Sequence, residues 1–371
     1  MKIAVFGHKR IPSREGGVEI VAEELSVRMA AMGHRVTCYN RSGHHVSGAE
    51  FDGRRLDSYR GVRLKSVPTL DKKGLAAVTA SFFAAIAAAF SSAWVVHIHA
   101  EGPAFFCWIP KLFGKRVVVT VHGLDWQREK WKQGFGSRFI RMGEKMAVRF
   151  ADRIIVLSRN VQDYFMDTYG RETVWIPNGV SRPEMAPADK IRQQFGLETE
   201  QYILFLGRLV PEKGIHYLLE AYRMLNTEKK LVIAGGVSDT DDYLARLKEI
   251  AGSSEKILFT GFVQGQTLAE LYSNAYLYVL PSDVEGMPLS LLEAMSYGNC
   301  CVVSDIPECA EVVEDRAAVF PRGNVKALAQ CLQTLCDDPG LTAKKKAEAA
   351  DFICGKYSWD DVTEKTLELY Q

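Results

Sequence analysis

The sequence predicts an α/β protein of two doubly wound domains, each a parallel sheet with helices on both faces. Short apolar runs rich in β-branched residues alternate with helical patterns along the whole chain, and this alternation is typical of parallel sheets. The chain has 371 residues, more than one hydrophobic core usually holds. Turn residues also gather near its middle, at residues 176–180, before the alternation resumes.

The apolar runs indicate where the strands lie. In the first half we expect strands at residues 2–6, 36–39, 62–67, 93–99, 116–121 and 153–157. In the second half we expect them at residues 202–206, 231–234, 257–259, 277–280, 300–304 and 317–320. The helices between them include residues 18–32, closed by Gly33, and residues 289–297, closed by Gly298, because glycine commonly ends a helix.

The turn-rich segment divides the chain. Residues 1–181 are expected to form one domain and residues 182–356 another, with the two facing each other across a central cleft. Ligands of doubly wound sheets bind outside the carboxyl ends of the strands. The loops that follow the strands are therefore the places where we look for chemistry.

One uncharged segment, residues 74–96, is long enough to span a bilayer. It is mostly alanine, interrupted by Thr79 and Ser81, and alanine contributes little to membrane insertion. Ser91 and Ser92 also indicate a break before the strand at 93–99. We expect a buried helix followed by a buried strand, with a membrane span as the alternative.

The composition is typical of a soluble globular protein. Hydrophobic residues make up 47% of the chain and charged residues 25%, which excludes intrinsic disorder, collagen and a disulfide-knotted scaffold. The eight cysteines show no C-x-x-C spacing and no histidine at zinc-binding distance, so we expect buried reduced thiols rather than a metal or disulfide framework. Met1 leads directly into a strand-like run, which leaves no room for a signal peptide and predicts a cytoplasmic protein.

The charges are divided unevenly. The formal net charge of +1 gives no general reason to expect nucleic acid as a partner. Residues 1–181 nevertheless hold 27 Lys and Arg against 16 Asp and Glu, whereas residues 182–371 hold 19 against 29. A basic half indicates a polyanionic partner, such as an anionic membrane surface or a phosphorylated substrate.

A basic helix expected at residues 137–151 points the same way. On a helical wheel, one face is apolar and the adjacent face is basic: Phe139, Met142, Met146 and Phe150 on the first, and Arg138, Arg141, Lys145 and Arg149 on the second. Peripheral enzymes bind anionic membranes through such helices. The alternative is an ordinary domain helix with a solvated basic face.

Two loops of the first half are candidates for chemistry. The loop at residues 7–19 ends in Gly16 and Gly17 before a helix; it lacks the G-x-G-x-x-G pattern, which disfavours a dehydrogenase, but it suits a phosphate at the helix N-terminus. The alternative is a turn that merely needs positive φ. His122 follows the strand at 116–121, where it could donate to a substrate hydroxyl or transfer a proton, unless it is a structural histidine.

In the second half, Arg208 and Lys213 lie five residues apart in the loop after the strand at 202–206. Both cations could converge on a diphosphate, Arg208 through its planar fork and Lys213 as a point charge. The alternative is a solvated charge pair.

The strongest signal is the block from residue 283 to residue 295. Pro288 suits the first turn of a helix, which leaves the amides of Leu289 and its neighbours available to a phosphate or sugar oxygen. Glu285 lies before the helix and Glu293 about a turn and a half into it, so the two carboxylates could bind hydroxyls at two ends of an extended ligand. Two ordinary surface glutamates are the alternative.

These motifs resemble the retaining GT-B glycosyltransferases of family 4. The resemblance is carried by Glu285-x7-Glu293, Gly207-Arg208-Leu209 with Glu212-Lys213-Gly214, Thr260-Gly261-Phe262 and Ile176-Pro177-Asn178-Gly179-Val180. The opening, with Arg10-Ile11-Pro12 and Gly16-Gly17-Val18-Glu19, is similar to the rhamnosyltransferase-like branch of capsule and exopolysaccharide assembly. The resemblance implies a GT-B fold of two Rossmann-like domains, in which residues 1–181 bind the acceptor, residues 182–356 bind the nucleotide-sugar, and residues 357–371 form a helix that packs back on the first domain.

The resemblance also implies the donor-binding roles in the second domain. Arg208 and Lys213 would bind the donor diphosphate, and Glu293 would bind the ribose hydroxyls. Phe262, after Gly261, would lie beside the nucleobase.

The remaining implied roles concern the transferred sugar and the phosphates. Glu285, with Gly286 and the amides around Met287 and Leu289, would bind the sugar. His122 would contact the sugar near its reacting carbon, and Gly16 with Gly17 would close over the phosphates. The catalytic residues would then be His122, Glu285, Arg208 and Lys213.

The family is metal-independent, so the resemblance implies neither a metal nor another cofactor. Arg208, Lys213 and a helix N-terminus would supply the positive charge that Mg²⁺ would otherwise provide. Pro288 departs from the family's Glu-Gly-x-Gly stretch and removes one amide donor. Retention through two inversions would need a carboxylate nucleophile, and none is evident in the first-half loops. We therefore expect the front-face route, in which the leaving phosphate helps to deprotonate the acceptor.

The predicted function is a retaining hexosyltransferase of bacterial surface polysaccharide synthesis, acting on a glycan or lipid-linked saccharide, in the cytoplasm or peripherally on the inner membrane face. Glu293 on a ribose suits UDP-sugars first and GDP-sugars next. The rhamnosyltransferase-like opening instead suits dTDP-rhamnose, whose nucleoside lacks the 2′-hydroxyl. Two alternatives stay open: a nucleotide-sugar epimerase of the same fold, and a non-catalytic partner subunit of a transferase.

Overall fold

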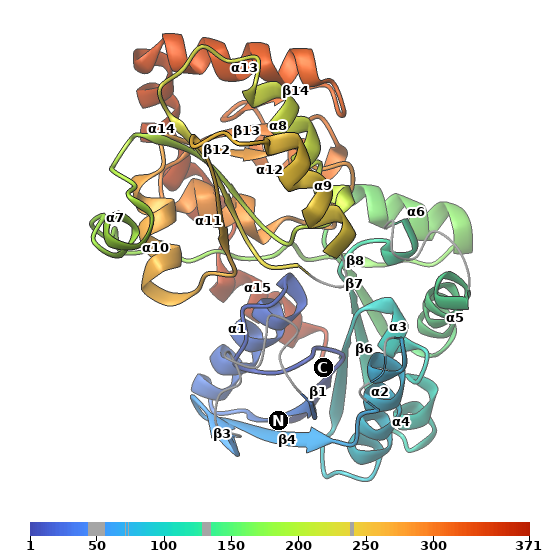
Figure 1. Ribbon diagram of the computed structural model, residues 1–371. Coiled ribbons are helices and arrows are strands. Elements are labelled where there is room, and N and C mark those ends of the chain that lie inside the picture. Colours follow the sequence, from blue (N-terminus) through green and yellow to red (C-terminus); the bar gives the residue numbers. More distant parts are fainter. Residues whose placement is uncertain (44–55, 71, 73, 128–134, 238–240) are drawn as a thin grey trace. The chain divides into compact units, whose positions relative to one another are not determined.

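The computed structural model describes residues 1–43, 56–70, 72, 74–127, 135–237 and 241–371 (Figure 1). These residues form two compact units. The first comprises Met1–Gly179 together with Trp359–Gln371, and the second comprises Val180–Ser358. Each unit contains one largely parallel sheet packed against helices, so the predicted pair of doubly wound, Rossmann-like α/β domains is confirmed. The cleft expected between them stays a prediction.

The described part of the first unit holds an eight-stranded sheet in the order β3-β4-β2-β1-β5-β6-β7-β8. Its strands are β1 (Lys2–Phe6), β2 (Arg35–Arg41), β3 (Ser58–Tyr59), β4 (Val62–Val67), β5 (Val95–His99), β6 (Arg116–Val121), β7 (Arg153–Val156) and β8 (Val174–Trp175). Only β3 runs antiparallel to its neighbour, β4. The sequence predicted the six longer strands; it missed β3 and β8, because two residues show no periodicity.

Helices lie on both faces of this sheet (Figure 1). They are α1 (Gly17–Ala31), α2 (Leu75–Ala89), α3 (Glu101–Ala104), α4 (Trp108–Leu112), α5 (Phe135–Phe150), α6 (Arg159–Tyr169) and α15 (Trp359–Glu368). Successive strand residues face opposite sides, so Val96 and Ile98 of β5 join the core that includes the alanines of α2. His97 and His99 face the other side, where the end of the chain contacts His97 through Tyr370.

The terminal helix α15 belongs to the first unit, although almost the whole second unit precedes it in the sequence. It packs on α1, and Arg28 Nε of α1 donates to Asp360 Oδ1 at 3.0 Å. Beyond the helix, Arg116 Nε at the start of β6 donates to the carbonyl of Leu369 at 2.9 Å. The end of the chain therefore completes the domain that its beginning forms.

Residues 74–96 form a helix followed by a strand, as predicted, but the prediction that the helix is buried is wrong for one of its faces. The alanines of α2, including Ala84 and Ala88, are buried, whereas Phe82 and Phe83 are 38% and 40% exposed. Within the described residues, every helix is too short or too polar to cross a bilayer.

The basic helix α5 also differs from its prediction. Met142, placed on the apolar face by the wheel, is 45% exposed, and the buried stripe runs through Ile140, Glu144 and Ala147. Gly143 packs so closely on α3 that an added Cβ would lie 2.0 Å from the carbonyl oxygen of Glu101. The basic residues of α5 (Arg138, Arg141, Lys145 and Arg149) are exposed.

The described part of the second unit holds a six-stranded parallel sheet in the order β11-β10-β9-β12-β13-β14. Its strands are β9 (Tyr202–Leu206), β10 (Lys230–Ala234), β11 (Ile257–Gly261), β12 (Leu277–Leu280), β13 (Cys300–Ser304) and β14 (Ala318–Phe320). Its helices are α7 (Lys190–Phe195), α8 (Ile215–Tyr222), α9 (Asp241–Ala251), α10 (Gly265–Asn274), α11 (Leu289–Ser296), α12 (Pro307–Val313), α13 (Val325–Asp337) and α14 (Pro339–Lys356). All six strands were predicted, with small differences at their ends. The eight cysteines of the chain are free thiols, and five of them are buried.

Candidate active site

The strand order of the second unit changes direction between β9 and β12. The chain places β10 and β11 on one side of β9 and then returns to place β12, β13 and β14 on the other. The connections that leave β9 and β12 therefore run in opposite directions along the sheet, and this switch point is where doubly wound sheets bind their ligands. Half of the twelve predicted donor-binding residues lie on these two loops, and Leu289 and Glu293 lie in helix α11, which follows the second loop.

An ion pair joins the two loops. Lys213 Nζ, after β9, lies 2.5 Å from Glu285 Oε1, after β12, and the two side chains are only 12% and 9% exposed. Ser282 Oγ donates to the same carboxylate oxygen at 2.6 Å. The prediction named both charged residues; the structure shows that they contact each other directly.

The loops approach each other closely because residue 214 is glycine. Gly214 has φ +65°, and an added Cβ would lie 2.0 Å from the carbonyl oxygen of Pro281. A backbone hydrogen bond also joins the two loops two residues away from this contact, since the Asp283 amide donates to the Glu212 carbonyl at 2.8 Å. Tyr217 of α8 donates to Asp283 Oδ2 at 3.2 Å. The geometry around Lys213 and Glu285 is therefore fixed by backbone contacts as well as by charge.

Arg208 lies on the same loop as Lys213 and is half-buried. The backbone on either side of it is tied to the segment after β10: the Leu209 amide donates to the Gly236 carbonyl at 3.0 Å. Gly235, at φ +144°, lies so close to Gly207 that an added Cβ would be 1.8 Å from its carbonyl oxygen. These contacts hold the arginine-bearing turn in one conformation.

Helix α11 begins at Leu289, so Pro288 precedes the first turn instead of occupying it. Pro288 is the N-cap residue, with φ −76° and ψ 105°, and its carbonyl accepts the amides of Leu291 and Leu292 at 3.1 and 3.3 Å. The prediction of a proline within the first turn is therefore wrong by one residue. Gly286 and Met287, just before it, are buried.

Glu293, in the middle of α11, is held by a tyrosine. Tyr272 OH donates to Glu293 Oε2 at 3.3 Å. Burial and the nearby carboxylate raise the pKa of Tyr272 well above its usual range, so the phenol stays a hydrogen-bond donor. Neighbouring Tyr278 OH donates to the Leu206 carbonyl at 3.2 Å and bonds Ser290 Oγ at 2.9 Å, which connects α11 to the end of β9.

Phe262 follows Gly261, the last residue of β11, and is half-buried. Gly261 has φ +72°, which glycine adopts readily. Because β11 is two strands from β9, the structure places Phe262 away from the Lys213 and Glu285 pair along the same edge of the sheet.

In the first unit, Gly16 is the N-cap residue of α1 and Gly17 begins the helix. Gly16 is extended, at φ −170°, and Gly17 has no positive φ either, so the alternative of a turn that needs positive φ is excluded. An added Cβ on Gly16 would lie 2.7 Å from Glu19 Oε2. Glu19 turns back over the loop and accepts the Lys9 amide at 2.9 Å.

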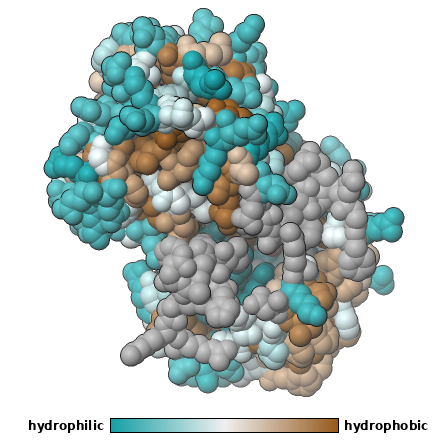
Figure 2. Space-filling view, in the orientation of Figure 1, coloured by the Kyte–Doolittle hydropathy of each residue, from teal (hydrophilic) through white to brown (hydrophobic). Residues whose placement is uncertain are grey.

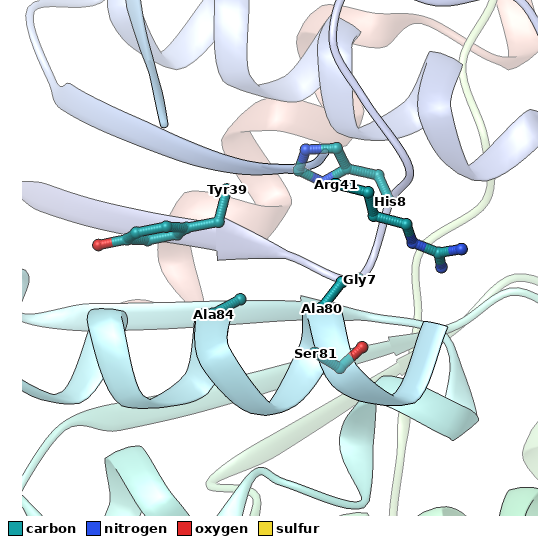
Figure 3. Close-up of a pocket in the computed structure, with 7 residues that line it drawn as sticks. All are labelled: Gly7, His8, Tyr39, Arg41, Ala80, Ser81 and Ala84. Atoms are coloured by element: carbon teal, nitrogen blue, oxygen red, sulfur yellow. The ribbon is translucent and has the colours of Figure 1, made fainter. Parts of the chain in front are cut away.

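The loop after β1 is also tied to neighbouring strands. His8 is buried, its Nε2 bonds Asn40 Oδ1 at 3.0 Å, and burial lowers its pKa to about 4. Gly7 has φ +110°, and an added Cβ would lie 2.1 Å from the His99 carbonyl oxygen. Figure 3 shows His8 and Arg41 beside α2 in a small pocket whose other walls are Gly7, Tyr39, Ala80, Ser81 and Ala84.

His122, at the end of β6, belongs to a cluster of buried histidines. His122 Nε2 lies 3.0 Å from His99 Nδ1, and the ring centroids of His99 and His97 lie 4.3 Å apart with the rings tilted by 30°. His97 bonds Tyr370 OH at 2.6 Å and Thr120 Oγ1 at 2.7 Å. Burial lowers the pKa of His97 to about 3 and that of His99 well below its usual range, so both rings are neutral. The neutral His99 partner fixes the orientation of the His122 ring.

A second buried cluster contacts the segment that follows His122. Glu101 and Glu144 are 1% and 0% exposed, and Glu101 Oε2 accepts the Asp125 amide at 2.9 Å. Burial, followed by the carboxylates of Asp125 and Glu144, raises the pKa of Glu101 well above its usual range. Tyr164 OH donates to Glu144 Oε1 at 2.9 Å, and Tyr169 donates to the same oxygen.

Sequence reasoning missed these buried clusters. The alternation His97-x-His99 in an apolar strand could have indicated two rings on one face. No local signal pairs either of them with Tyr370, which is far away in the sequence. No gathering of three or more His, Cys, Asp or Glu side chains suited to a metal occurs in the part of the chain that the structure describes.

The predicted site residues therefore fall into two groups. Gly16, Gly17 and His122 lie in the first unit. The second unit contains the residues of the β9 and β12 loops, of α11 and of the segment after β11: Arg208, Lys213, Gly261, Phe262, Glu285, Gly286, Met287, Pro288, Leu289 and Glu293.

Two family models match adjoining parts of the chain. The Glycosyltransferase Family 4 model matches residues 15–182, and the model for Glycosyl transferases group 1 matches residues 187–352. Together they span almost the whole chain.

Individual proteins agree with the models. An uncharacterized glycosyltransferase of Methanocaldococcus jannaschii is 28% identical over 75% of this chain and 73% of its own length. The O-antigen chain mannosyltransferase B of Escherichia coli is 34% identical, over 49% of this chain and 48% of its own.

Solved structures share the fold. HepE of Anabaena, in complex with UDP and glucose, has a TM-score of 0.83 at 19% identity, and the match covers 99% of this chain and 98% of that one. WaaG, a glycosyltransferase of lipopolysaccharide biosynthesis, has a TM-score of 0.79 at 18% identity, covering 100% and 99%. With two Rossmann-like domains and both family models matched, the chain belongs to the GT-B glycosyltransferases of family 4 and group 1.

Proposed function

We propose that this glycosyltransferase is a retaining, metal-independent enzyme that takes its sugar from a nucleotide-sugar, with UDP-sugars as the first choice. The observation that carries the proposal is the Lys213–Glu285 pair at the switch point of the second unit. It holds a cation suited to a diphosphate directly beside a carboxylate suited to sugar hydroxyls. HepE, which shares the fold, was solved with UDP and glucose.

The charges on the β9 loop account for the proposed metal independence. A diphosphate leaving group gains negative charge in the transition state, and fixed cations stabilise it when they are positioned in advance. Lys213 is positioned by Glu285 and by the close contact at Gly214, and Arg208 by the backbone contacts around it. The two cations would replace Mg²⁺ at the phosphates.

The hydrogen bond between Tyr272 and Glu293 supports a role for Glu293 in donor binding. The Tyr272 hydroxyl donates a hydrogen bond to one oxygen of the Glu293 carboxylate and so fixes the orientation of that carboxylate. We assign Glu293 to the ribose hydroxyls, and Glu285 with the backbone from Gly286 to Leu289 to the transferred sugar. Phe262 is assigned to the nucleobase, Gly16 and Gly17 to the phosphates, and His122 to the sugar near its reacting carbon.

For retention we propose the front-face route, in which the leaving phosphate accepts the proton of the attacking acceptor hydroxyl. Glu101, the carboxyl group after β5, is 1% exposed and holds the Asp125 amide, so it is unsuited to act as a nucleophile. A covalent intermediate is the competing mechanism. Detection by mass spectrometry of a glycosyl group trapped on a carboxylate in the Glu285→Gln variant would overturn the front-face route.

The test of the donor site is a thermal-shift panel with UDP, GDP, dTDP and their sugar conjugates, with and without Mg²⁺. A ligand at about 100 times its dissociation constant adds roughly 2.7 kcal/mol to stability, which gives a clear shift. We expect one base to stabilise the wild type without metal, and Lys213→Met to abolish that stabilisation. Arg192→Ala, on an exposed ion pair of the same unit, is the matched control.

The outcomes separate the candidate functions. No shift with any nucleotide would contradict a donor site and favour a non-catalytic partner subunit. Conversion of a bound nucleotide-sugar to its epimer without any acceptor would favour an epimerase.

We further propose that the acceptor is a glycan or lipid-linked saccharide of bacterial surface polysaccharide synthesis, reached from the cytoplasm at the inner membrane face. The name of the Escherichia coli relative, O-antigen chain mannosyltransferase B, refers to the O-antigen chain. The exposed arginines of α5 support an electrostatic attraction to anionic lipid. Changing Arg138, Arg141 and Arg149 to Glu should abolish binding to anionic liposomes without changing donor affinity; unchanged liposome binding would refute this role of α5.

A further inference from the structure

An ordinary surface helix buries its large apolar side chains, whereas helix α2 buries its small side chains and exposes large ones. It buries alanines, among them Ala80, Ala84 and Ala88, and exposes Phe82 and Phe83. Burying an aromatic side chain gains far more free energy than burying a methyl group. In a chain without a partner, we would therefore expect α2 to bury its phenylalanines and expose its alanines. Exposed aromatic residues on an uncharged helix indicate that something covers them.

The exposed side chains continue beyond α2 into one surface. Phe90, at the C-cap of α2, is 72% exposed and lies 4.6 Å from the ring of Phe113 after α4. Phe82 contacts the ring of Phe106, which in turn lies near Phe139 of α5. We define the aromatic surface as six of the exposed large apolar residues of α2, α4 and the segments after them: Phe82, Phe83, Phe90, Trp94, Leu112 and Phe113. Figure 2 shows brown atoms gathered where Figure 1 labels α2 and α4.

The charges around the aromatic surface are mostly positive. No residue from Gly74 to Ala100 is charged, and Lys111 and Lys115 are the first charges that follow Glu101. Lys111 is paired with Asp152 Oδ1 at 2.5 Å. Lys115 Nζ bonds the carbonyls of Ser91 and Ala93 at 2.7 and 2.8 Å, so it lies beside Phe90 and Trp94. On the side of Phe139, the surface continues into α5, whose exposed charged residues are basic.

We propose that the aromatic surface inserts into the headgroup and outer acyl region of an anionic lipid bilayer. A rim of lysines and arginines around protruding aromatic rings complements a surface that is negative outside and apolar inside. A second copy of the chain fits less well, because a symmetric pair would place this basic rim against itself. Helix α2 has 15 residues, too few to cross the membrane, so it lies on the bilayer.

The inserting residues differ from the basic face of α5 proposed above. The α5 charges attract the protein from a distance and are screened by salt, whereas the aromatic surface resists salt once it is inserted. Vesicle binding requires neither a donor nor turnover. Membrane insertion can therefore be refuted while the proposed transferase function stands, and the proposed transferase function can be refuted while membrane insertion stands.

The first test is co-sedimentation of the full chain with vesicles of phosphatidylcholine alone and of phosphatidylcholine with phosphatidylglycerol. We expect binding to the anionic vesicles, with a part that persists in high salt. The triple variant Phe83→Gln, Phe90→Gln, Phe113→Gln should bind at least about tenfold more weakly, since each lost aromatic side chain removes a large apolar area. These residues are exposed, so the variant should keep the wild-type unfolding midpoint.

The matched control changes exposed apolar residues of the second unit. Met185 and Met224 are 62% and 56% exposed, and Met185→Gln with Met224→Gln should leave vesicle binding unchanged. An equal loss in the control and the triple variant would overturn the proposal. So would unchanged binding in the triple variant, or a wild type that binds no vesicle.

A second measurement needs no apolar-to-polar variant. Trp94 is 60% exposed at the edge of the surface, and its fluorescence should be quenched by lipids brominated near the headgroup. The difference between the wild type and Trp94→Phe isolates its signal from the other tryptophans. Absence of quenching would overturn insertion, and a wild-type dimer that the triple variant converts to a monomer without any vesicle binding would show that a second copy covers the surface.

Discussion

A lysine and a glutamate from different loops form the contact on which the donor proposal rests. Replacing Lys213 by Met removes the cation beside the nearly buried Glu285 carboxylate and leaves the hydrogen bond from Ser282. We expect the free energy of unfolding to fall by roughly 2–4 kcal/mol, because an uncompensated charge stays in a poorly solvated place.

The control for this prediction is an exposed pair in the same unit. Lys256 lies 2.9 Å from Glu228, with the two side chains 46% and 95% exposed. Lys256→Met should change stability by less than about 1 kcal/mol, since water already solvates both charges. Urea unfolding of the two variants measures the difference, and equal losses would show that the Lys213 pair has no special role in stability.

Glu101 gives a prediction about pH. Its pKa in the folded protein is raised, so it contributes stability when protonated, and that contribution is lost as the pH rises through the folded pKa. Glutamine keeps the acceptor for the Asp125 amide and does not titrate. Glu101→Gln should therefore be more stable than the wild type by roughly 1–3 kcal/mol near pH 8, with the difference shrinking toward acid.

Thermal unfolding from about pH 6 to pH 9 measures this difference. Glu364→Gln, at an exposed position of the same unit, should follow the wild type throughout. A Glu101→Gln variant that is less stable at every pH would contradict a protonated Glu101.

At the residue scale, the sequence predicted charges and glycines better than it predicted partners. Arg208, Lys213, Glu285 and Glu293 were recognisable because they lie in short motifs. The bond between His97 and Tyr370 joins residues 273 positions apart, and no local pattern encodes such a pairing. The motifs of the site could therefore be predicted, whereas the supporting hydrogen bonds required the structure.

Among the structural elements, the close approach of the β9 and β12 loops gives a prediction with a matched control. Gly214 and Gly252 have nearly the same φ, +65° and +62°, but only Gly214 has atoms where an added Cβ would lie. Gly252→Ala should cost about 1 kcal/mol for the strained backbone alone. Gly214→Ala should cost several times more and also weaken nucleotide binding, because the loops must separate.

Thermal unfolding and nucleotide titration of the two variants test this prediction. Similar losses of stability in both would show that backbone strain, and not the contact with Pro281, makes glycine necessary at residue 214.

Strands were predicted more reliably than helix faces. A buried parallel strand is apolar on both sides, and so β1, β6, β9, β12 and β13 match their predicted ranges. A helix face has to be inferred from the wheel, which assumes that large apolar side chains are buried. That assumption failed for α2, which exposes Phe82, and for α5, which exposes Met142.

At the scale of the whole molecule, the end of the chain stabilises the first unit. Tyr370 is fully buried and bonded to His97, so Tyr370→Ala should lower stability by roughly 3–5 kcal/mol, as for other large buried side chains. The exposed Glu368→Ala is the control. Limited proteolysis should show faster cleavage within residues 1–179 than within residues 180–358 in the Tyr370 variant, and uniform cleavage would contradict a local effect.

The chain passes from the first unit to the second and back at neighbouring positions. The Val180 amide donates to the Tyr357 carbonyl at 2.8 Å, and an added Cβ on Gly179 would lie 2.6 Å from Trp359. Ribosomes synthesise proteins from the N-terminus onward, and N-terminal domains generally fold first. Here the first unit lacks its last helix until the second unit has been synthesised, so the domain that emerges first is the last to be completed.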